Sequence, residues 1–311
     1  MAQRSNVAII RSDDDYVEVE KVLDGRHDTA LKYVSQYASF SEKIYGREDS
    51  NINKWVNNWE KLDFHFDDFR PESKKGIWLE GLKVESYFKK EGEFAYVVIV
   101  FRGTRFTKWQ DWYSNFNVIT RFIPFVHNSY RQIILQINEY INAIAGYLIN
   151  DRKIANSIQN IKFSSAGHSL GGGLAQQAAY ASKHIETVYA FDPSPVTGYS
   201  SIKKTDRKIN CEGLKIYRIW EHGEILLYLR MITKAARKIA FIPNLNPRIV
   251  EVRFNFAEKV DTITEHSMQD LALSMIGAEK SFINLKKIDD KTSALANPHR
   301  ANPPRKSSPE S

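Results

Sequence analysis

The stretch from residue 161 to residue 180, IKFSSAGHSLGGGLAQQAAY, constrains the fold of this chain more than any other. It opens with a short apolar run, passes through Gly167-His168-Ser169-Leu170-Gly171, and continues as an alanine-rich helical pattern. A strand, a sharp turn and a helix with a serine at the apex form a strained elbow that exposes the hydroxyl above a sheet. The flanking glycines fit this elbow because strand and helix approach closely there. A glycine-rich helix N-terminus that packs tightly or binds an anion is the alternative interpretation.

Strand and helix patterns alternate along the rest of the chain. Apolar, β-branched runs predict buried strands, and apolar residues at helical spacing predict helices. The predicted strands cover residues 77–89, 94–101, 186–191, 214–220 and 249–256, and the predicted helices cover 28–45, 129–148 and 262–276. This alternation predicts an α/β fold with a mainly parallel central sheet flanked by helices, in which ligands bind at the carboxyl ends of the strands.

Composition excludes several classes of protein. Hydrophobic residues make up 42% and charged residues 26% of the chain, as in ordinary globular proteins. The net charge of +7 is spread along the sequence, and no compact basic block with interleaved aromatic residues indicates nucleic acid. The charge either only aids solubility or favours peripheral contact with an anionic membrane. Residues 225–243 come closest to a transmembrane helix, but their basic residues indicate an amphipathic basic helix instead.

The single cysteine, Cys211, excludes an internal disulfide framework. The first fifteen residues lack the apolar core of a secretory signal. We therefore predict a cytoplasmic protein, with delivery as an exported effector as an alternative.

A serine hydroxyl needs a base to accept its proton and an acid to orient that base. The order serine, acid, histidine along the chain is that of α/β-hydrolases. Ser169 is followed by Asp192 and Glu224, each close after a predicted strand, and then by the late histidine His266. We predict Ser169, Glu224 and His266 as the catalytic triad, with Asp192 as the alternative acid.

The negative oxygen of the reaction intermediate needs two backbone N–H donors. One comes from the residue after the nucleophile, which is Leu170, and the second from an earlier turn between a strand and a loop. Phe101-Arg102-Gly103-Thr104 forms such a turn, so Thr104 is the predicted second donor. No metal or cofactor is required by this chemistry.

Five motifs in this order resemble the class 3 lipase family, the α/β-hydrolases similar to fungal triacylglycerol lipases. The motifs are FRGTR, DWYSN, GHSLGGGLA, IYRIWEHGEILLYL and EHSM, and the resemblance covers roughly residues 28–280. It implies Ser169 as the nucleophile and His266 as the base, with Glu224 in place of the usual aspartate. The disulfides and signal peptide of secreted fungal members are absent from this sequence.

The resemblance also suggests a division of the chain. Residues 1–27 are a predicted leader, residues 28–285 a lipase-like domain, and residues 286–311 a Pro- and Ser-rich disordered tail. Residues 106–126, rich in aromatic side chains, take the place of the lid that covers the site in this family.

These observations predict a serine hydrolase, either a triacylglycerol lipase or a phospholipase, that cleaves carboxylic esters of lipids through an acyl-enzyme. The alternatives are an esterase, thioesterase or acyltransferase on a soluble acyl substrate, and a non-catalytic module that binds a lipid or a partner. The sequence leaves the oligomeric state open.

Overall fold

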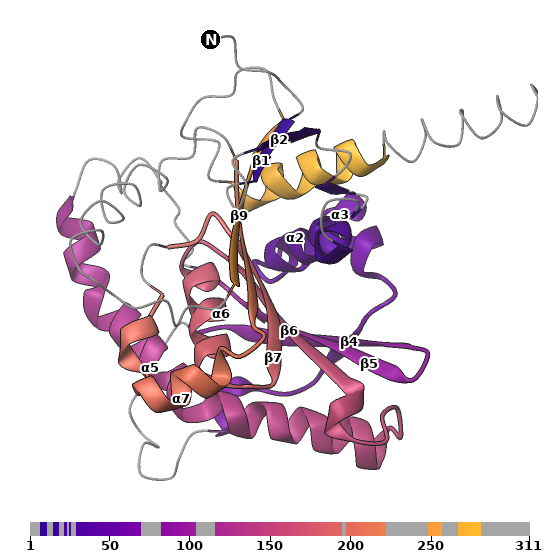
Figure 1. Cartoon of the computed structure of the whole chain (residues 1–311), viewed down its shortest axis with the longest axis vertical. Coiled ribbons are helices and arrows are strands. Elements are labelled where there is room, and N and C mark those ends of the chain that lie inside the picture. The colour runs from indigo at the N-terminus through magenta and orange to yellow at the C-terminus, as the bar shows by residue number, and fades with distance from the viewer. Residues whose placement is uncertain are drawn as a thin grey trace, which may run out of the picture.

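A computed structural model describes residues 7–10, 15–18, 22–23, 25, 29–69, 82–103, 116–194, 197–221, 248–256 and 267–280. Within these ranges nine strands form one sheet, in the order β2-β1-β9-β8-β7-β6-β5-β4-β3 (Figure 1). The strands are β1 (Val7–Ile10), β2 (Asp15–Glu18), β3 (Glu60–Leu62), β4 (Val84–Glu91), β5 (Phe94–Phe101), β6 (Ile161–His168), β7 (Ile185–Phe191), β8 (Lys215–Glu221) and β9 (Arg248–Asn255).

The centre of the sheet is parallel and both sides are antiparallel. Strands β5 to β9 run in one direction, whereas β3 and β4 on one side and β1 and β2 on the other alternate in direction. Phe101 pairs with Gly167, and Phe191 pairs with both His168 and Ile219. The carboxyl ends of β5, β6, β7 and β8 therefore meet at one edge of the sheet, where such folds bind their ligands.

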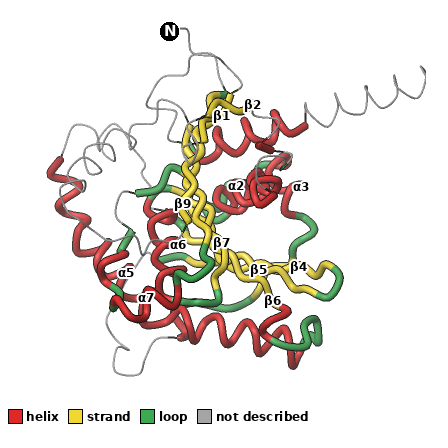
Figure 2. The backbone as a smooth tube through the Cα atoms, viewed as in Figure 1, coloured by secondary structure: helices red, strands yellow, loops and turns green. Residues whose placement is uncertain are grey.

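Helices cover both faces of the sheet (Figures 1 and 2). One face carries α5 (Phe116–Gly146), α6 (Leu170–Ala181) and α7 (Lys204–Asn210), and α6 contacts β5, β6 and β7. The other face carries α2 (Val34–Lys43), α3 (Ser50–Val56) and the helix of residues 268–280. Shorter turns are η1 (Thr29–Tyr33), η2 (Phe66–Phe69), η4 (Tyr147–Asp151), η5 (Ile158–Asn160) and η6 (Tyr199–Ser201). None of the helices in the described ranges is long and apolar enough to cross a bilayer.

Apolar and polar residues do not alternate along strand β5, and its burial explains why. Val97, Ile99 and Phe101 belong to the cluster under α5 and α6, and Val98 and Val100 belong to the cluster under α2. Successive side chains of a strand point to opposite faces, and both faces are buried here, so every position is apolar.

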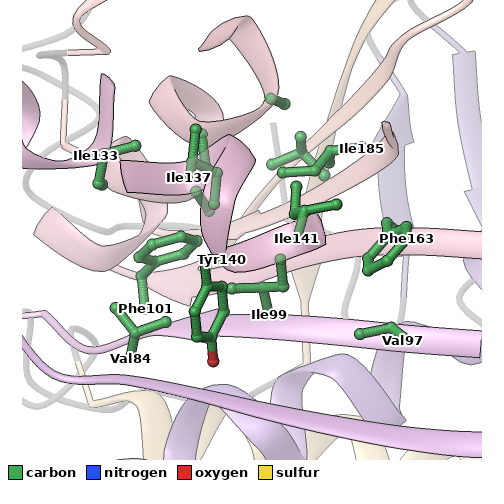
Figure 3. Packing of buried hydrophobic residues seen from close by; sticks show 14 of the residues in the cluster. Val84, Val97, Ile99, Phe101, Ile133, Ile137, Tyr140, Ile141, Phe163 and Ile185 are labelled. Atoms are coloured by element: carbon green, nitrogen blue, oxygen red, sulfur yellow. The ribbon is translucent and has the colours of Figure 1, made fainter. Parts of the chain in front are cut away.

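The cluster under α5 is filled by one stripe of that helix (Figure 3). Ile133, Ile137, Tyr140 and Ile141 face the apolar residues of β5. The buried Tyr140 hydroxyl meets the Ser86 hydroxyl at 2.8 Å, which satisfies both polar groups. This packing fixes β5, and with it the turn that follows Phe101.

The predicted α/β class with a mainly parallel central sheet is confirmed. Two elements differ from the expectation. Helix α5 begins at Phe116, so the second half of the predicted lid-like segment 106–126 is helical. Strand β1, inside the predicted leader, pairs with β9 and extends the sheet. The pairing of β1 has a tertiary cause, since a short strand gains its stability from neighbouring strands.

The predicted tail 286–311 and the predicted basic helix 225–243 lie outside the described residues.

Candidate active site

Ser169 forms the turn between β6 and α6. Strand β6 ends at His168 and α6 begins at Leu170, which leaves one residue for the change of direction. Ser169 adopts φ 56° and ψ −122°. A non-glycine residue in such a region costs of order 1–3 kcal/mol and persists only where its surroundings hold it. The predicted elbow is therefore present as a strained turn with the serine at its apex.

Close packing explains the glycines around Ser169. A Cβ on Gly171 would overlap the carbonyl oxygen of Phe101 and lie 2.8 Å from the backbone nitrogen of Gly103. A Cβ on Gly167 would overlap the carbonyl of Gly171. Strand β6, helix α6 and the turn after β5 therefore touch through their backbones, and only glycine fits at these contacts.

Backbone hydrogen bonds fix the elbow to the next strand. The Ser169 N–H donates to the Phe191 carbonyl at 2.9 Å, and the Ser194 N–H donates to the Ser169 carbonyl at 3.0 Å. The Asp192 N–H donates in turn to the Ile219 carbonyl on β8 at 2.8 Å. These bonds hold Ser169 from both sides and supply the restraint that its strained backbone requires.

The hydroxyl of Ser169 is in a position to react. The residue is partly exposed, and its side chain makes no capping hydrogen bond to α6. Leu170 follows as the first residue of α6, where a backbone N–H has no partner within the helix. A nucleophile and a donor for a negative oxygen thus occur at adjacent residues.

Asp192 lies directly after β7 at the same edge. Its side chain is buried, and its φ of 38° is unusual for a residue other than glycine. Two of the three non-glycine residues with positive φ in the described ranges, Ser169 and Asp192, are therefore in contact with this edge. The structure brings the alternative acid into the loop whose backbone binds the elbow.

Thr104, Glu224 and His266 lie outside the described residues. The nearest described neighbours of Thr104 and Glu224 are at the expected edge. Gly103 follows the end of β5, and β8 ends three residues before Glu224. Ser267 directly precedes the helix of residues 268–280, which packs on the α2 face of the sheet.

One residue at the elbow was missed by the sequence argument. Tyr45 follows α2, and its hydroxyl lies 3.2 Å from Nδ1 of the buried His168. The sequence assigned Tyr45 to the apolar side of the helix predicted over residues 28–45. Nothing in the sequence connects it to a residue more than a hundred positions away, because only the packing of α2 on β5, β6 and β7 brings them together.

A serine elbow at the carboxyl edge of a mainly parallel sheet, between a strand and a helix, defines an α/β-hydrolase. Residues 36–194, about half of the chain, match the model of the Tle-like phospholipase domain. The chain therefore belongs to this phospholipase-like family. The predicted lipase-like family and the predicted hydrolysis of lipid esters are confirmed at this level.

Solved structures of lipases and esterases align with the chain at low identity. A fungal lipase from a lipase–inhibitor complex aligns with a TM-score of 0.40 and 14% identity, over 61% of this chain and 71% of that chain. Lipase II from Rhizopus niveus gives 0.36 and 14%, over 65% and 75%. Esterase B from Lactobacillus rhamnosis gives 0.34 and 10%, over 85% and 98%. No curated protein matches the chain.

Proposed function

We propose that this chain is a serine hydrolase that cleaves a carboxylic ester of a phospholipid through an acyl-enzyme, with Ser169 as the nucleophile. The observation that carries the proposal is the backbone of Ser169, strained at φ 56° between β6 and α6 and held by hydrogen bonds to β7. A turn of this kind presents the serine hydroxyl above the sheet.

The proposed reaction follows from the residues that succeed the parallel strands. Ser169 Oγ attacks the ester carbonyl while His266 accepts the hydroxyl proton, and Glu224 orients the imidazole. The backbone N–H groups of Leu170 and Thr104 stabilise the tetrahedral oxyanion. Collapse of this intermediate breaks the ester bond, and the departing alcohol takes the proton from His266. Water then attacks the acyl-enzyme by the same route and releases the fatty acid.

The strand order supports this set of residues. Neighbouring parallel strands β6, β7, β8 and β9 are followed in turn by Ser169, Asp192, Glu224 and, further along the chain, His266. Because the strand ends share one edge, residues that follow them closely have the opportunity to meet there.

Asp192 remains the alternative acid, and its backbone supports a different role. Its N–H bonds to β8, and its loop bonds to the carbonyl of Ser169, so this residue belongs to the support of the elbow. Glu224 follows β8, which lies one strand further from β6 than β7 does. We therefore assign Glu224 as the orienting acid and test Asp192 against it.

Family membership supports a phospholipid as the substrate. The net charge of +7 supports contact with an anionic membrane surface during catalysis. Hydrolysis and vesicle binding should then both increase when phosphatidylglycerol is added to phosphatidylcholine vesicles, and both should fall as salt is raised.

The test is hydrolysis of p-nitrophenyl esters and of phospholipid vesicles by the wild type and four variants. Ser169→Ala should abolish activity and labelling by a fluorophosphonate, whereas Ser201→Ala, an exposed serine on η6, should retain both. Glu224→Gln should reduce kcat by about 10⁴-fold and Asp192→Asn by much less. The reverse order of the two acid variants would name Asp192 as the acid.

Three other outcomes would contradict the proposal. Activity that persists in Ser169→Ala would exclude this nucleophile. A wild type that hydrolyses nothing and takes up no fluorophosphonate would favour a non-catalytic lipid-binding module. Activity on soluble esters without a rise on micelles or vesicles would favour an esterase.

A further inference from the structure

Tyr45 occupies a fixed place beside the elbow. It lies in the turn that ends α2, where the Tyr45 N–H donates to the Glu42 carbonyl at 3.0 Å. The next residue, Gly46, has a φ of 77° and ends the helix. The Lys83 ammonium donates to the Ile44 carbonyl at 3.2 Å, and the guanidinium of Arg47 lies 5.9 Å from the centre of the Tyr45 ring. These contacts hold the backbone around Tyr45 and place a cation near its ring.

The hydroxyl of Tyr45 reaches two separate segments. On one side it lies 3.2 Å from Nδ1 of His168, the last residue of β6. On the other side it touches the turn after β5, since a Cβ on Gly103 would lie 2.5 Å from the Tyr45 oxygen. Burial raises the pKa of Tyr45, and a hydrogen bond from the backbone N–H of Gly103 lowers it in part. The oxygen thus accepts from Gly103 and forms a second hydrogen bond with Nδ1 of His168.

The two segments joined in this way are those that precede the proposed oxyanion donors. Gly103 is followed by Thr104, and His168 is two residues before Leu170. Phe101 and Gly167 pair in register, so the two segments leave the sheet side by side. The Tyr45 hydroxyl contacts both segments, at Gly103 and His168, close to the pair Phe101 and Gly167.

We propose that Tyr45 is a positioning residue for the proposed oxyanion hole: its hydroxyl ties Gly103, in the turn after β5, to His168 at the end of β6, and so holds the chain just before the proposed donor Thr104 against the elbow. The inference rests on the proposed function and adds a residue to it. Tyr45 acts through these backbones and does not touch the substrate.

The size of the effect follows from the demands of an oxyanion hole. Its donors must lie about 2.7–3.1 Å from the developing negative oxygen, and the loss of one donor reduces kcat by about 10²–10³-fold. Removal of the tie shifts a donor without deleting it, so we expect kcat to fall by about 10- to 100-fold. The effect acts on the transition state, so KM should change by less than about threefold.

The test is Tyr45→Phe, with Tyr37→Phe as the matched control. Both tyrosines flank or belong to α2, and the Tyr37 hydroxyl is likewise buried and hydrogen-bonded, accepting from Ser164 Oγ at 3.1 Å. Ser164 lies in the middle of β6 and not at the elbow. Both variants lose one buried hydroxyl, but only Tyr45→Phe should lower kcat and the rate of inactivation by a fluorophosphonate.

Amide hydrogen exchange provides a readout that does not depend on turnover. Peptides that cover residues 101–104 and 167–171 should exchange faster in Tyr45→Phe and remain unchanged in Tyr37→Phe. Equal exchange rates in Tyr45→Phe and the wild type would refute the proposed link between the turn after β5 and the elbow, even if the wild type proved inactive. An unchanged kcat in Tyr45→Phe would overturn the positioning role. Equal losses of kcat in both variants, in proportion to lost stability, would reduce Tyr45 to a packing residue.

Discussion

Replacement of Ser169 by glycine should make the protein inactive and more stable. Ser169 holds φ 56° and ψ −122°, a region that side chains disfavour and that glycine adopts readily. The variant removes the Cβ that causes the backbone strain together with the hydroxyl that the proposed reaction needs. Loss of activity and gain of stability therefore arise from one substitution.

The comparison with Ser169→Ala isolates the backbone contribution. Alanine also lacks the hydroxyl but keeps the Cβ and its strain. Relief of the strain is worth roughly 1–3 kcal/mol. About 0.4–1 kcal/mol of this gain in stability is offset, because glycine gives the unfolded chain greater conformational freedom than alanine does. The free energy of unfolding of Ser169→Gly should then exceed that of Ser169→Ala by about 0.5–2 kcal/mol, a rise in Tm of roughly 1–6 °C.

The assay is urea unfolding of the wild type and both variants, followed by circular dichroism and tryptophan fluorescence. The three proteins should share one m-value and differ in their midpoints, since a change of midpoint at constant m reports stability. Coincident transitions with the two probes support the comparison. Equal midpoints for the two variants, or a lower midpoint for glycine, would refute the claim that Ser169 is strained and held by its neighbours.

Two further predictions concern glycine positions and a buried acid. Gly171→Ala should destabilise the protein by more than about 3 kcal/mol, because its Cβ would overlap the Phe101 carbonyl. Gly146→Ala should stabilise the protein by about 0.5–1 kcal/mol, because no atom lies within 4 Å of the added Cβ. Urea midpoints measure both, and a tolerated Gly171→Ala would contradict the close contact of strand and helix. Burial raises the pKa of Glu42 from 4.5 to about 7, so between these values only the unfolded state loses its proton and stability falls as the pH rises. Glu42→Gln should remove this decline and be more stable than the wild type at pH 8 by roughly 1–3 kcal/mol, and parallel stability curves from pH 4 to pH 8 would contradict it.

Much of the fold is predictable because its strands are buried on both faces. The run from Phe94 to Phe101 has no polar residue at any position, and the structure shows why, since alternate side chains enter separate clusters. The start of α5 at Phe116 and the pairing of β1 with β9 were not predicted. The pairing of β1 with β9 joins segments far apart along the chain, and local periodicity does not contain such a contact.

The elbow is predictable for a related reason. Its backbone requires small residues around one serine, and these residues are neighbours in the sequence, from Gly167 to Gly171. The place of Tyr45 follows no such local rule. Its partner His168 is 123 positions away, and the contact arises only from the docking of α2 on the sheet. The roles of Glu224, His266 and Thr104 remain predictions from their order along the chain.

The sequence separates the proposed nucleophile from the proposed proton relay. Residues 36–194, which match the phospholipase domain model, contain Tyr45, Ser169 and the turn after β5. Glu224 and His266 come later, after β8 and β9. The two parts are joined where the Asp192 N–H donates to the Ile219 carbonyl across β7 and β8. Because the loop that contains Asp192 also binds the backbone of Ser169, any shift of β8 against β7 would reach the nucleophile. The rigidity of the proposed site therefore depends on this pair of strands as well as on the elbow itself.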